Sequence, residues 1–155
     1  MSARWPRPIF FVVILLVIAL DQFTKWWATL SLAPLRSVVL IPGLFNLTYV
    51  RNTGVAFGLF AGQGLFVGLL VMALAVAAIF FTRDIDWRRS EPNLVGGCLA
   101  GGALGNLLDR ARLGHVVDFF DVHLGLHQWP VFNVADSLIC LAVGWIVLRQ
   151  FQGAK

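Results

Sequence analysis

The stretch IFFVVILLVIALDQFTKWWATL, residues 9–30, is apolar over its first twelve residues and only then contains Asp21 and Lys25. Its length is close to the roughly 20 residues with which a helix crosses a bilayer. A backbone in lipid must satisfy its own hydrogen bonds, and this run lacks the alternation of a barrel strand. We therefore predict that residues 9–30 form a membrane-spanning helix.

The composition of the whole chain agrees with a membrane protein. Of its 155 residues, 59% are hydrophobic and only 13% are charged, whereas soluble domains carry about 25% charged residues. The length leaves room for one domain, residues 1–155. The predicted fold class is an all-α integral membrane protein.

Three further apolar segments have lengths near that of a bilayer-crossing helix, at residues 65–81, 92–108 and 134–148. We predict four transmembrane helices in all. They would leave two longer extracytoplasmic segments, residues 31–64 and 109–133. One alternative for the first segment is a cleavable signal peptide, but its candidate cleavage site, SLA, lies far beyond the apolar run.

Basic residues predict the orientation of the spans. The net charge is +4, but the basic residues form no stripe, so no nucleic-acid partner is expected. One side of the predicted membrane has more of them, and both termini are therefore expected in the cytoplasm. That side carries Arg4, Arg7, Arg83, Arg88, Arg89, Arg149 and Lys155, and the other carries Arg36, Arg51, Arg110 and Arg112.

Two patterns predict local structure. Gly97, Gly101 and Gly105 recur every four residues, which lets helices pack closely. Residues 37–57 contain two β-prone runs separated by Pro42 and Gly43, which indicates a small β-structured segment on the outer leaflet.

Several polar residues of the spans and outer segments have local structural interpretations. Asp21 and Lys25 are four residues apart and can pair on one helix face. Asp109, beside Arg110 and Arg112, can end the third span in an interfacial ion pair. Asp121 is interpreted as a solvated loop residue.

Two further residues have turn or cap interpretations. Asn52 with Gly54 is typical of a turn. Asn133 can cap the fourth span, with Asp136 at the third position of that helix. Asp118, between apolar neighbours, has no such local explanation.

Other chemistries receive little support. The spacing of His115, His123 and His127 does not match a structural zinc pattern, and no metalloprotease, nucleophile-elbow or phosphate-binding motif is present. Cys98 and Cys140 lie within apolar runs, so no disulfide framework is expected. We predict neither a metal nor a cofactor.

Carboxylates without a metal can still hydrolyse a peptide bond. Two carboxyl groups held close share a proton, so that one activates water while the other polarises the carbonyl. Local chemistry leaves the pair open among Asp109, Asp118, Asp121 and Asp136.

Five motifs in order resemble the lipoprotein (type II) signal peptidases of bacteria. They are DQFTK at 21–25, RNTGVAFG at 51–58, GGALGNLLDR at 101–110, VVDFFD at 116–121 and FNVADS at 132–137. The resemblance implies a membrane aspartic endopeptidase of the cytoplasmic membrane, with its active site at the extracytoplasmic face. Its substrates would be prolipoproteins bearing a diacylglyceryl-cysteine, cleaved just before that cysteine.

The resemblance also implies roles for particular residues. Asp118 and Asp136 would be the catalytic dyad. Residues that would bind substrate or line its pocket are Asn52, Gly54, Asn106, Arg110 and Asn133, whereas Asp21, Lys25 and Asp109 are expected to be structural. The family further implies contact with membrane lipid, and inhibition by the cyclic peptide globomycin.

Two other function classes compete with this reading. A proton-coupled transporter or channel subunit would also place carboxylates in a membrane, but no inverted repeat is visible. A structural scaffold would use the acids only as ion pairs. Ion flux and tolerance to Asp→Asn changes would discriminate them.

Overall fold

The structure is a computed structural model that describes residues 5–54, 86–125 and 127–153. The predicted span at 65–81 lies outside these residues. In chain order, the elements are α1 (Pro8–Ser31), β1 (Ser37–Ile41), β2 (Phe45–Asn52), α3 (Ser90–Leu113), β3 (Val116–Leu124), β4 (His127–Gln128) and α4 (Val134–Gly153).

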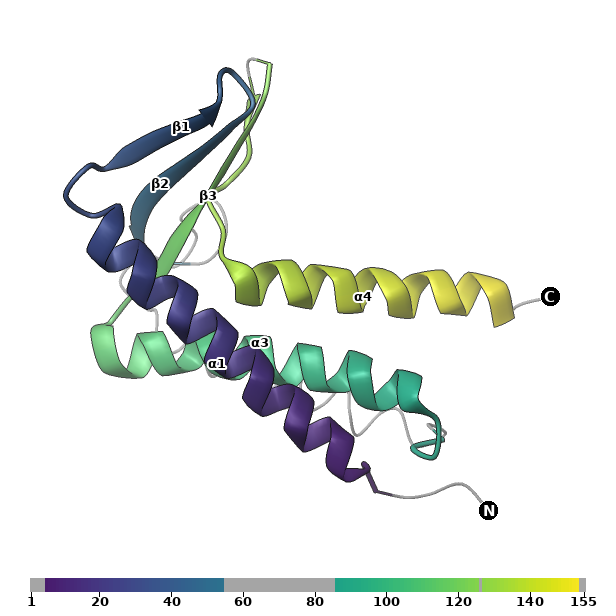
Figure 1. The fold of residues 1–155 in the computed structure, drawn as a ribbon. Coiled ribbons are helices and arrows are strands. Elements are labelled where there is room, and N and C mark those ends of the chain that lie inside the picture. The colour runs from purple at the N-terminus through teal and green to yellow at the C-terminus, as the bar shows by residue number, and fades with distance from the viewer. Residues whose placement is uncertain (1–4, 55–85, 126, 154–155) are drawn as a thin grey trace.

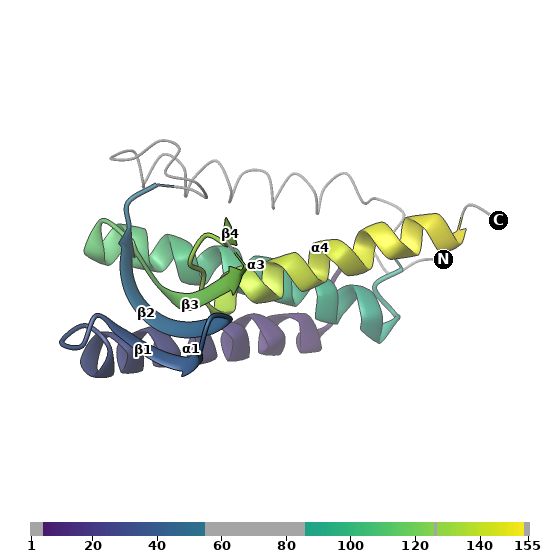
Figure 2. The same cartoon turned by 90° about the horizontal axis from the view of Figure 1, so that it is seen from above.

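The helices and the sheet occupy opposite ends of the molecule. The sheet stands at one end of α1, α3 and α4, and the helices extend away from it (Figure 1). The first turn of α1 and the last turn of α4 both lie at the end remote from the sheet, in both views (Figures 1 and 2). This arrangement is the one expected if the two termini share a side of the membrane.

The predicted helix at residues 9–30 corresponds to α1. Pro8 occupies its first turn, where its missing N–H has no helical partner to lose. Large apolar side chains along α1 are exposed, including Phe11 at 56% and Leu15 at 67%. Within the described residues, α1 is the one helix whose length and mean hydropathy of 2.0 suit a membrane span.

Helix α3 lies between α1 and α4 because its glycines admit both neighbours. A Cβ atom added at Gly101 would lie 2.8 Å from the Cβ of Val17 in α1. One added at Gly102 would lie 2.9 Å from the carbonyl oxygen of Ala135 in α4. Since real Cβ contacts are not this short, the predicted close packing of the glycine-containing helix is confirmed.

The β-structured segment predicted after the first span is an antiparallel hairpin. Ser37 pairs with Thr48 across β1 and β2. Gly43 in the connecting turn has a φ of +74°, a left-handed conformation that glycine adopts without a steric cost. The structure therefore combines helices with a small sheet, as expected for this segment.

The sheet is larger than expected, because a strand from the second outer segment joins it. β3 pairs antiparallel with β2, and β4 folds back on β3, so the strand order is β1-β2-β3-β4. Asp121 lies within β3 and is 4% exposed. The interpretation of Asp121 as a solvated loop residue is therefore wrong.

Apolar side chains hold the sheet against the end of α1. Ala28 and Leu32 from this end of the helix pack with Val117 and Phe119 of β3, and all four are buried. The chain then returns to β3 before α4 begins, where Phe120 and Phe132 exchange backbone hydrogen bonds of 2.8 and 3.1 Å. This bridge brings the start of α4 beside β3.

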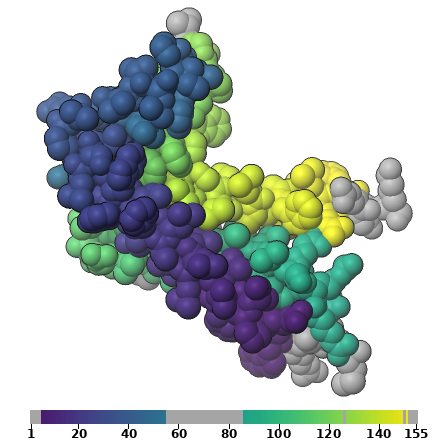
Figure 3. Space-filling model, in the orientation of Figure 1, coloured from purple at the N-terminus to yellow at the C-terminus, as the bar shows by residue number. Residues whose placement is uncertain are grey.

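The space-filling view shows the surface where the sheet meets the start of α4 (Figure 3). The sheet and α4 diverge at an open angle, with the first turn of α4 at its corner (Figure 3). The bridge between Phe120 and Phe132 places the segment before α4 beside the middle of β3.

Candidate active site

Asp118 is a buried carboxylate near the start of β3. It is 1% exposed, and it accepts hydrogen bonds from Nδ2 of Asn52 at 2.8 Å and from Nδ2 of Asn133 at 2.7 Å. Burial, together with repulsion from Asp136, raises the pKa of Asp118 to about 7, although the two amide bonds act in the opposite direction. Asp118 can therefore carry a proton near neutral pH.

The chain following β2 fixes the side chain of Asn52. Its Oδ1 accepts a 3.0 Å hydrogen bond from the backbone N–H of Gly54, which leaves its amide nitrogen to face Asp118. Arg110 of α3 donates from Nη2 to the carbonyl oxygen of Gly54 at 3.0 Å. The turn predicted for Asn52 and Gly54 thus also orients a donor to Asp118.

Asp136 lies in the first turn of α4, and Asn133 caps that helix. The backbone N–H of Asp136 donates to Oδ1 of Asn133 at 3.0 Å, and the backbone N–H of Asn133 donates to Oδ2 of Asp136 at 3.2 Å. This reciprocal pair is a capping box with Asp in place of Glu or Gln. The predicted cap is confirmed.

Asn106 of α3 connects this cap to the helices behind it. Its Nδ2 donates to Oδ1 of Asp136 at 2.7 Å. Its Oδ1 accepts from Nζ of Lys25 at 2.8 Å and from Nδ2 of Asn133 at 3.1 Å. The side chain of Asn106 thus links Lys25 of α1 to Asn133 and Asp136 at the start of α4.

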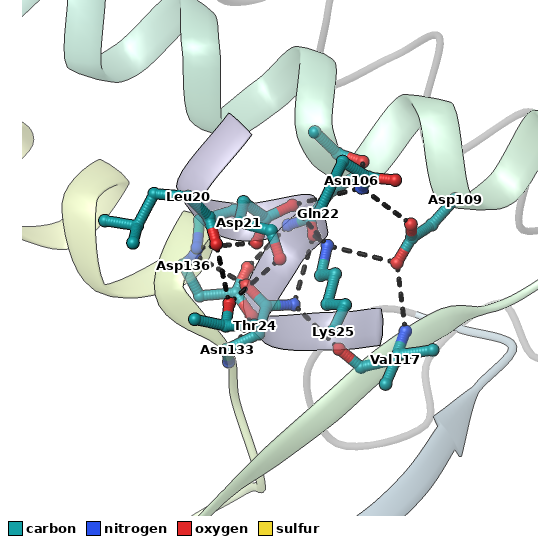
Figure 4. Close-up of polar contacts among 12 residues, drawn as sticks. Leu20, Asp21, Gln22, Thr24, Lys25, Asn106, Asp109, Val117, Asn133 and Asp136 are labelled. Atoms are coloured by element: carbon teal, nitrogen blue, oxygen red, sulfur yellow. Dashed lines mark hydrogen bonds and ion pairs between the residues drawn. The ribbon is translucent and has the colours of Figure 1, made fainter. Parts of the chain in front are cut away.

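The predicted pair of Asp21 and Lys25 is present, and it is part of a larger buried network (Figure 4). Nζ of Lys25 lies 2.8 Å from Oδ2 of Asp21 and 3.1 Å from Oδ2 of Asp109. Among the described residues, Asp109 forms its ion pair with Lys25 and not with the neighbouring Arg110. The expected interfacial ion pair at the end of the third span is wrong, because the side chain of Asp109 is buried and turns inward toward Lys25 and Gln22 of α1.

Asp121 belongs to a separate polar cluster in the sheet. Thr48 donates to its Oδ2 at 2.7 Å, and Gln128 donates to its Oδ1 at 2.9 Å. Burial raises the pKa of Asp121, but hydrogen bonds from Thr48, Gln128 and His123 outweigh this and lower it below the ordinary value. The geometry therefore joins Asp118 to Asp136 through Asn133, and leaves Asp121 outside.

Sequence reasoning missed two residues of these networks. Gln22 donates to Oδ1 of Asp109 at 2.8 Å, and Thr48 serves Asp121. Gln22 lies inside the DQFTK motif, which was the available signal, whereas nothing local marks Thr48. Its partner is 73 residues away in the chain.

The arrangement offers acid–base chemistry. A buried carboxyl group with a raised pKa lies next to a second, half-buried carboxyl group, and amides orient both. Such a pair can hold one proton and activate water. Within the described parts of the chain, no group of three His, Cys, Asp or Glu side chains is arranged to hold a metal ion.

Residues 13–152 match the family described as signal peptidase (SPase) II. The chain belongs to the signal peptidase II family. Its members are integral membrane aspartic endopeptidases of bacteria, so this chain is a hydrolase, and the alternative of a transporter or channel subunit is not favoured. The fold and the paired carboxyl groups are consistent with that chemistry.

Individual relatives cover nearly the same length. The chain is 43% identical to a lipoprotein signal peptidase of Oleidesulfovibrio alaskensis, over 94% of this chain and 98% of the relative. It is 41% identical to one of Syntrophotalea carbinolica, over 93% and 91%. The similarity to signal peptidase II thus extends over almost the whole chain.

Two solved structures described as bacterial membrane enzymes share the fold of this signal peptidase II. The first has a TM-score of 0.83 at 27% identity and covers 100% of this chain and 94% of its own. The second has a TM-score of 0.79 at 28% identity, with 97% of both chains covered. The combination of helices with a small sheet is therefore that of a known membrane enzyme.

Proposed function

We propose that this signal peptidase II removes the signal peptide from bacterial prolipoproteins, with Asp118 and Asp136 as its catalytic pair. The observation that carries the assignment is the connection of both carboxyl groups to one residue, Asn133. Family membership supplies the reaction, and the geometry favours this pair over any that includes Asp109 or Asp121.

The protonated member of the pair is assigned to Asp118. Its carboxyl group is the more buried of the two, and its pKa is raised to about 7. Asp136 then takes a proton from water, and the resulting hydroxide attacks the scissile carbonyl carbon while Asp118 donates a proton toward the carbonyl oxygen. The tetrahedral intermediate collapses as the C–N bond breaks: Asp136 gives the leaving nitrogen the proton that it took from water, and a hydroxyl of the intermediate returns a proton to Asp118.

The two products follow from this bond cleavage. The signal peptide leaves with a new carboxylate, and the lipoprotein begins at its diacylglyceryl-cysteine with a new α-amino group. We propose that the diacylglyceryl chains stay in membrane lipid during the reaction. Globomycin, as a cyclic peptide, would compete for the same site.

Residues around the pair would orient substrate. Arg110 holds the carbonyl of Gly54, while its Nε is buried and has no hydrogen-bond partner among the described residues. A donor without a partner in a buried position favours a substrate carbonyl as its acceptor. Asn52 and Gly54 would line the pocket, and Asn133 and Asn106 would hold the two aspartates.

The proposed topology is a single membrane domain, residues 1–155, with spans near 9–30, 65–81, 92–108 and 134–148. Both termini would lie in the cytoplasm, and the sheet and the catalytic pair at the extracytoplasmic face. The common end of the first turn of α1 and the last turn of α4 supports this topology. So do the lengths of α3 and α4, 24 and 20 residues.

A cleavage assay in detergent tests the proposed function. The purified protein is incubated with one prolipoprotein, prepared with and without its diacylglyceryl group, and the products are separated by gel shift. The account predicts cleavage of the lipidated form alone, immediately before the cysteine. Cleavage of both forms at equal rates would contradict the substrate assignment.

A further inference from the structure

Three buried charged side chains lie behind the proposed catalytic pair and take no part in the proposed reaction. Asp21, Lys25 and Asp109 are each at most 3% exposed, and Lys25 pairs with both carboxylates. Apolar side chains of similar volume often replace buried ion pairs without loss of stability. Stability alone therefore does not account for this arrangement.

The carboxylates of Asp21 and Asp109 each bind a chain segment that carries one of the two proposed catalytic aspartates. Oδ1 of Asp21 accepts a 3.1 Å hydrogen bond from the backbone N–H of Ala135, the residue before Asp136. Oδ2 of Asp109 accepts a 3.2 Å hydrogen bond from the backbone N–H of Val117, the residue before Asp118. The two segments are thus bound to two helices by equivalent contacts.

Lys25 contacts both of these carboxylates, Asp21 and Asp109. It also orients the side-chain amide of Asn106, which contacts Asp136 (Figure 4). Its ammonium group can only donate, so the atom of Asn106 that faces it at 2.8 Å must be the oxygen. The amide nitrogen of Asn106 then faces Asp136, to which it donates at 2.7 Å. Without the ammonium group, the amide oxygen of Asn106 would keep only one of its two donors, Nδ2 of Asn133.

We propose that Asp21, Lys25 and Asp109 form a positioning clamp that sets the separation of Asp118 and Asp136 and the orientation of Asn106. The clamp touches no substrate and acts through the backbone of Val117 and Ala135. This inference rests on the proposed catalytic pair. It assigns the three residues to turnover, beyond their structural role as ion pairs.

Two glycines of α3 provide a matched test that removes no polar group. A Cβ atom at Gly105 would lie 2.5 Å from Oδ2 of Asp21, the oxygen that Lys25 contacts. A Cβ atom at Gly101 would lie 2.8 Å from the Cβ of Val17 and 3.1 Å from the backbone carbonyl oxygen of Ile14 in the same helix interface, with no charged side chain among its nearest atoms. Gly105→Ala therefore displaces the clamp, and Gly101→Ala is the control for crowding between the helices.

The readouts are kcat and KM for a lipidated prolipoprotein, measured below the melting temperature of every variant. Gly105→Ala is expected to lower kcat about a hundredfold with KM little changed, since a displacement of about 1 Å has effects of that order. Gly101→Ala is expected to lower the melting temperature but to keep kcat within about threefold of wild type. Equal kcat values for the two variants would overturn the clamp.

A charge-free variant covers the case in which Gly105→Ala does not fold. In Asp21→Asn/Lys25→Met/Asp109→Asn, the amide oxygens can still accept from Ala135 and Val117, and no buried charge lacks a partner. It is expected to melt near wild type, while kcat falls at least about tenfold because Asn106 loses a contact that orients it. Wild-type kcat would overturn the proposal, and so would failure of this variant to fold while Gly101→Ala folds.

Asp118→Asn separates this inference from the proposed function. If Asp118→Asn keeps wild-type turnover, the catalytic pair is wrong and the clamp is overturned with it. If Asp118→Asn is inactive while Gly105→Ala turns over as fast as Gly101→Ala, the pair stands and only the clamp is wrong.

Discussion

Asp118 and Asp136 are joined through one residue: Asn133 donates from its side chain to Oδ1 of Asp118 at 2.7 Å and from its backbone to Oδ2 of Asp136 at 3.2 Å. The two carboxyl groups nevertheless differ in environment. Asp118 is buried in β3, whereas Asp136 is half-buried in the first turn of α4. In the proposed mechanism this asymmetry places the shared proton on Asp118, which has measurable consequences.

The first consequence is a pH limit on turnover. Because the pKa of Asp118 is raised to about 7 and its protonated form is required, kcat/KM is expected to fall about tenfold per pH unit above that value. The measurement is kcat/KM with a lipidated prolipoprotein between about pH 5 and 9. A constant kcat/KM across pH 7, in a protein that stays folded, would contradict the assignment.

The second consequence concerns the free energy of unfolding. The pKa of Asp118 in the native protein, about 7, lies above its ordinary value of 3.8, so the native state binds this proton more tightly than the unfolded state. The stabilisation is complete below about pH 4 and is lost as the pH rises through 7, a change of roughly 4 kcal/mol. Asp118→Asn is expected to lack this part of the pH dependence.

Thermal unfolding in detergent at about pH 5 and pH 8 checks this expectation. The difference in melting temperature between the two values should be smaller in Asp118→Asn than in wild type. Thr48→Ser, which leaves Asp118 untouched, is the control and should keep the wild-type difference. An equal difference in all three proteins would show that Asp118 ionises without cost in the native state.

Asn133 has two separable tasks, capping α4 and donating to Asp118. Asn133→Ser keeps a capping oxygen but loses the amide donor, whereas Asn133→Ala loses both. Both variants are expected to lose turnover by at least about tenfold, and only Asn133→Ala should lose a further 1 kcal/mol or so of stability. Comparing kcat and the free energy of unfolding tests the division, and full turnover of Asn133→Ser would refute the donor role.

Thr48 stabilises the sheet away from the catalytic pair. Thr48→Val removes the hydroxyl that donates to Asp121, which leaves a buried acceptor short of one hydrogen bond. The expected loss of stability is about 1–3 kcal/mol, with kcat changed little below the melting temperature. Thr48→Ser keeps the hydroxyl and should lose less stability. Equal melting temperatures of Thr48→Val and Thr48→Ser would contradict a stabilising hydrogen bond from Thr48 to Asp121.

Much of the fold could be predicted from local sequence. The apolar run at 9–30 predicts α1, because lipid and the need for backbone hydrogen bonds leave a helix as the solution. The turn at Pro42 and Gly43 predicts the hairpin of β1 and β2. Asn133 predicts the start of α4, since a cap acts within three residues of its own position.

The site was less predictable, because its contacts are long-range. The interpretation of Asp121 as a solvated loop residue is wrong because Thr48, of a strand distant in sequence, donates to its side chain within the sheet. Gln22 contacts Asp109 across 87 residues. The pair of Asp118 and Asp136 came from the resemblance to a family, since local chemistry alone left four aspartates open.

The most direct test of the account is turnover by two single-residue variants. Wild type, Asp118→Asn and Asp136→Asn are purified in the same detergent and compared on one lipidated prolipoprotein, with melting curves to show that each is folded. The account predicts cleavage by wild type and none by either folded variant. Wild-type turnover by either variant would contradict the assignment of Asp118 and Asp136 as the catalytic pair.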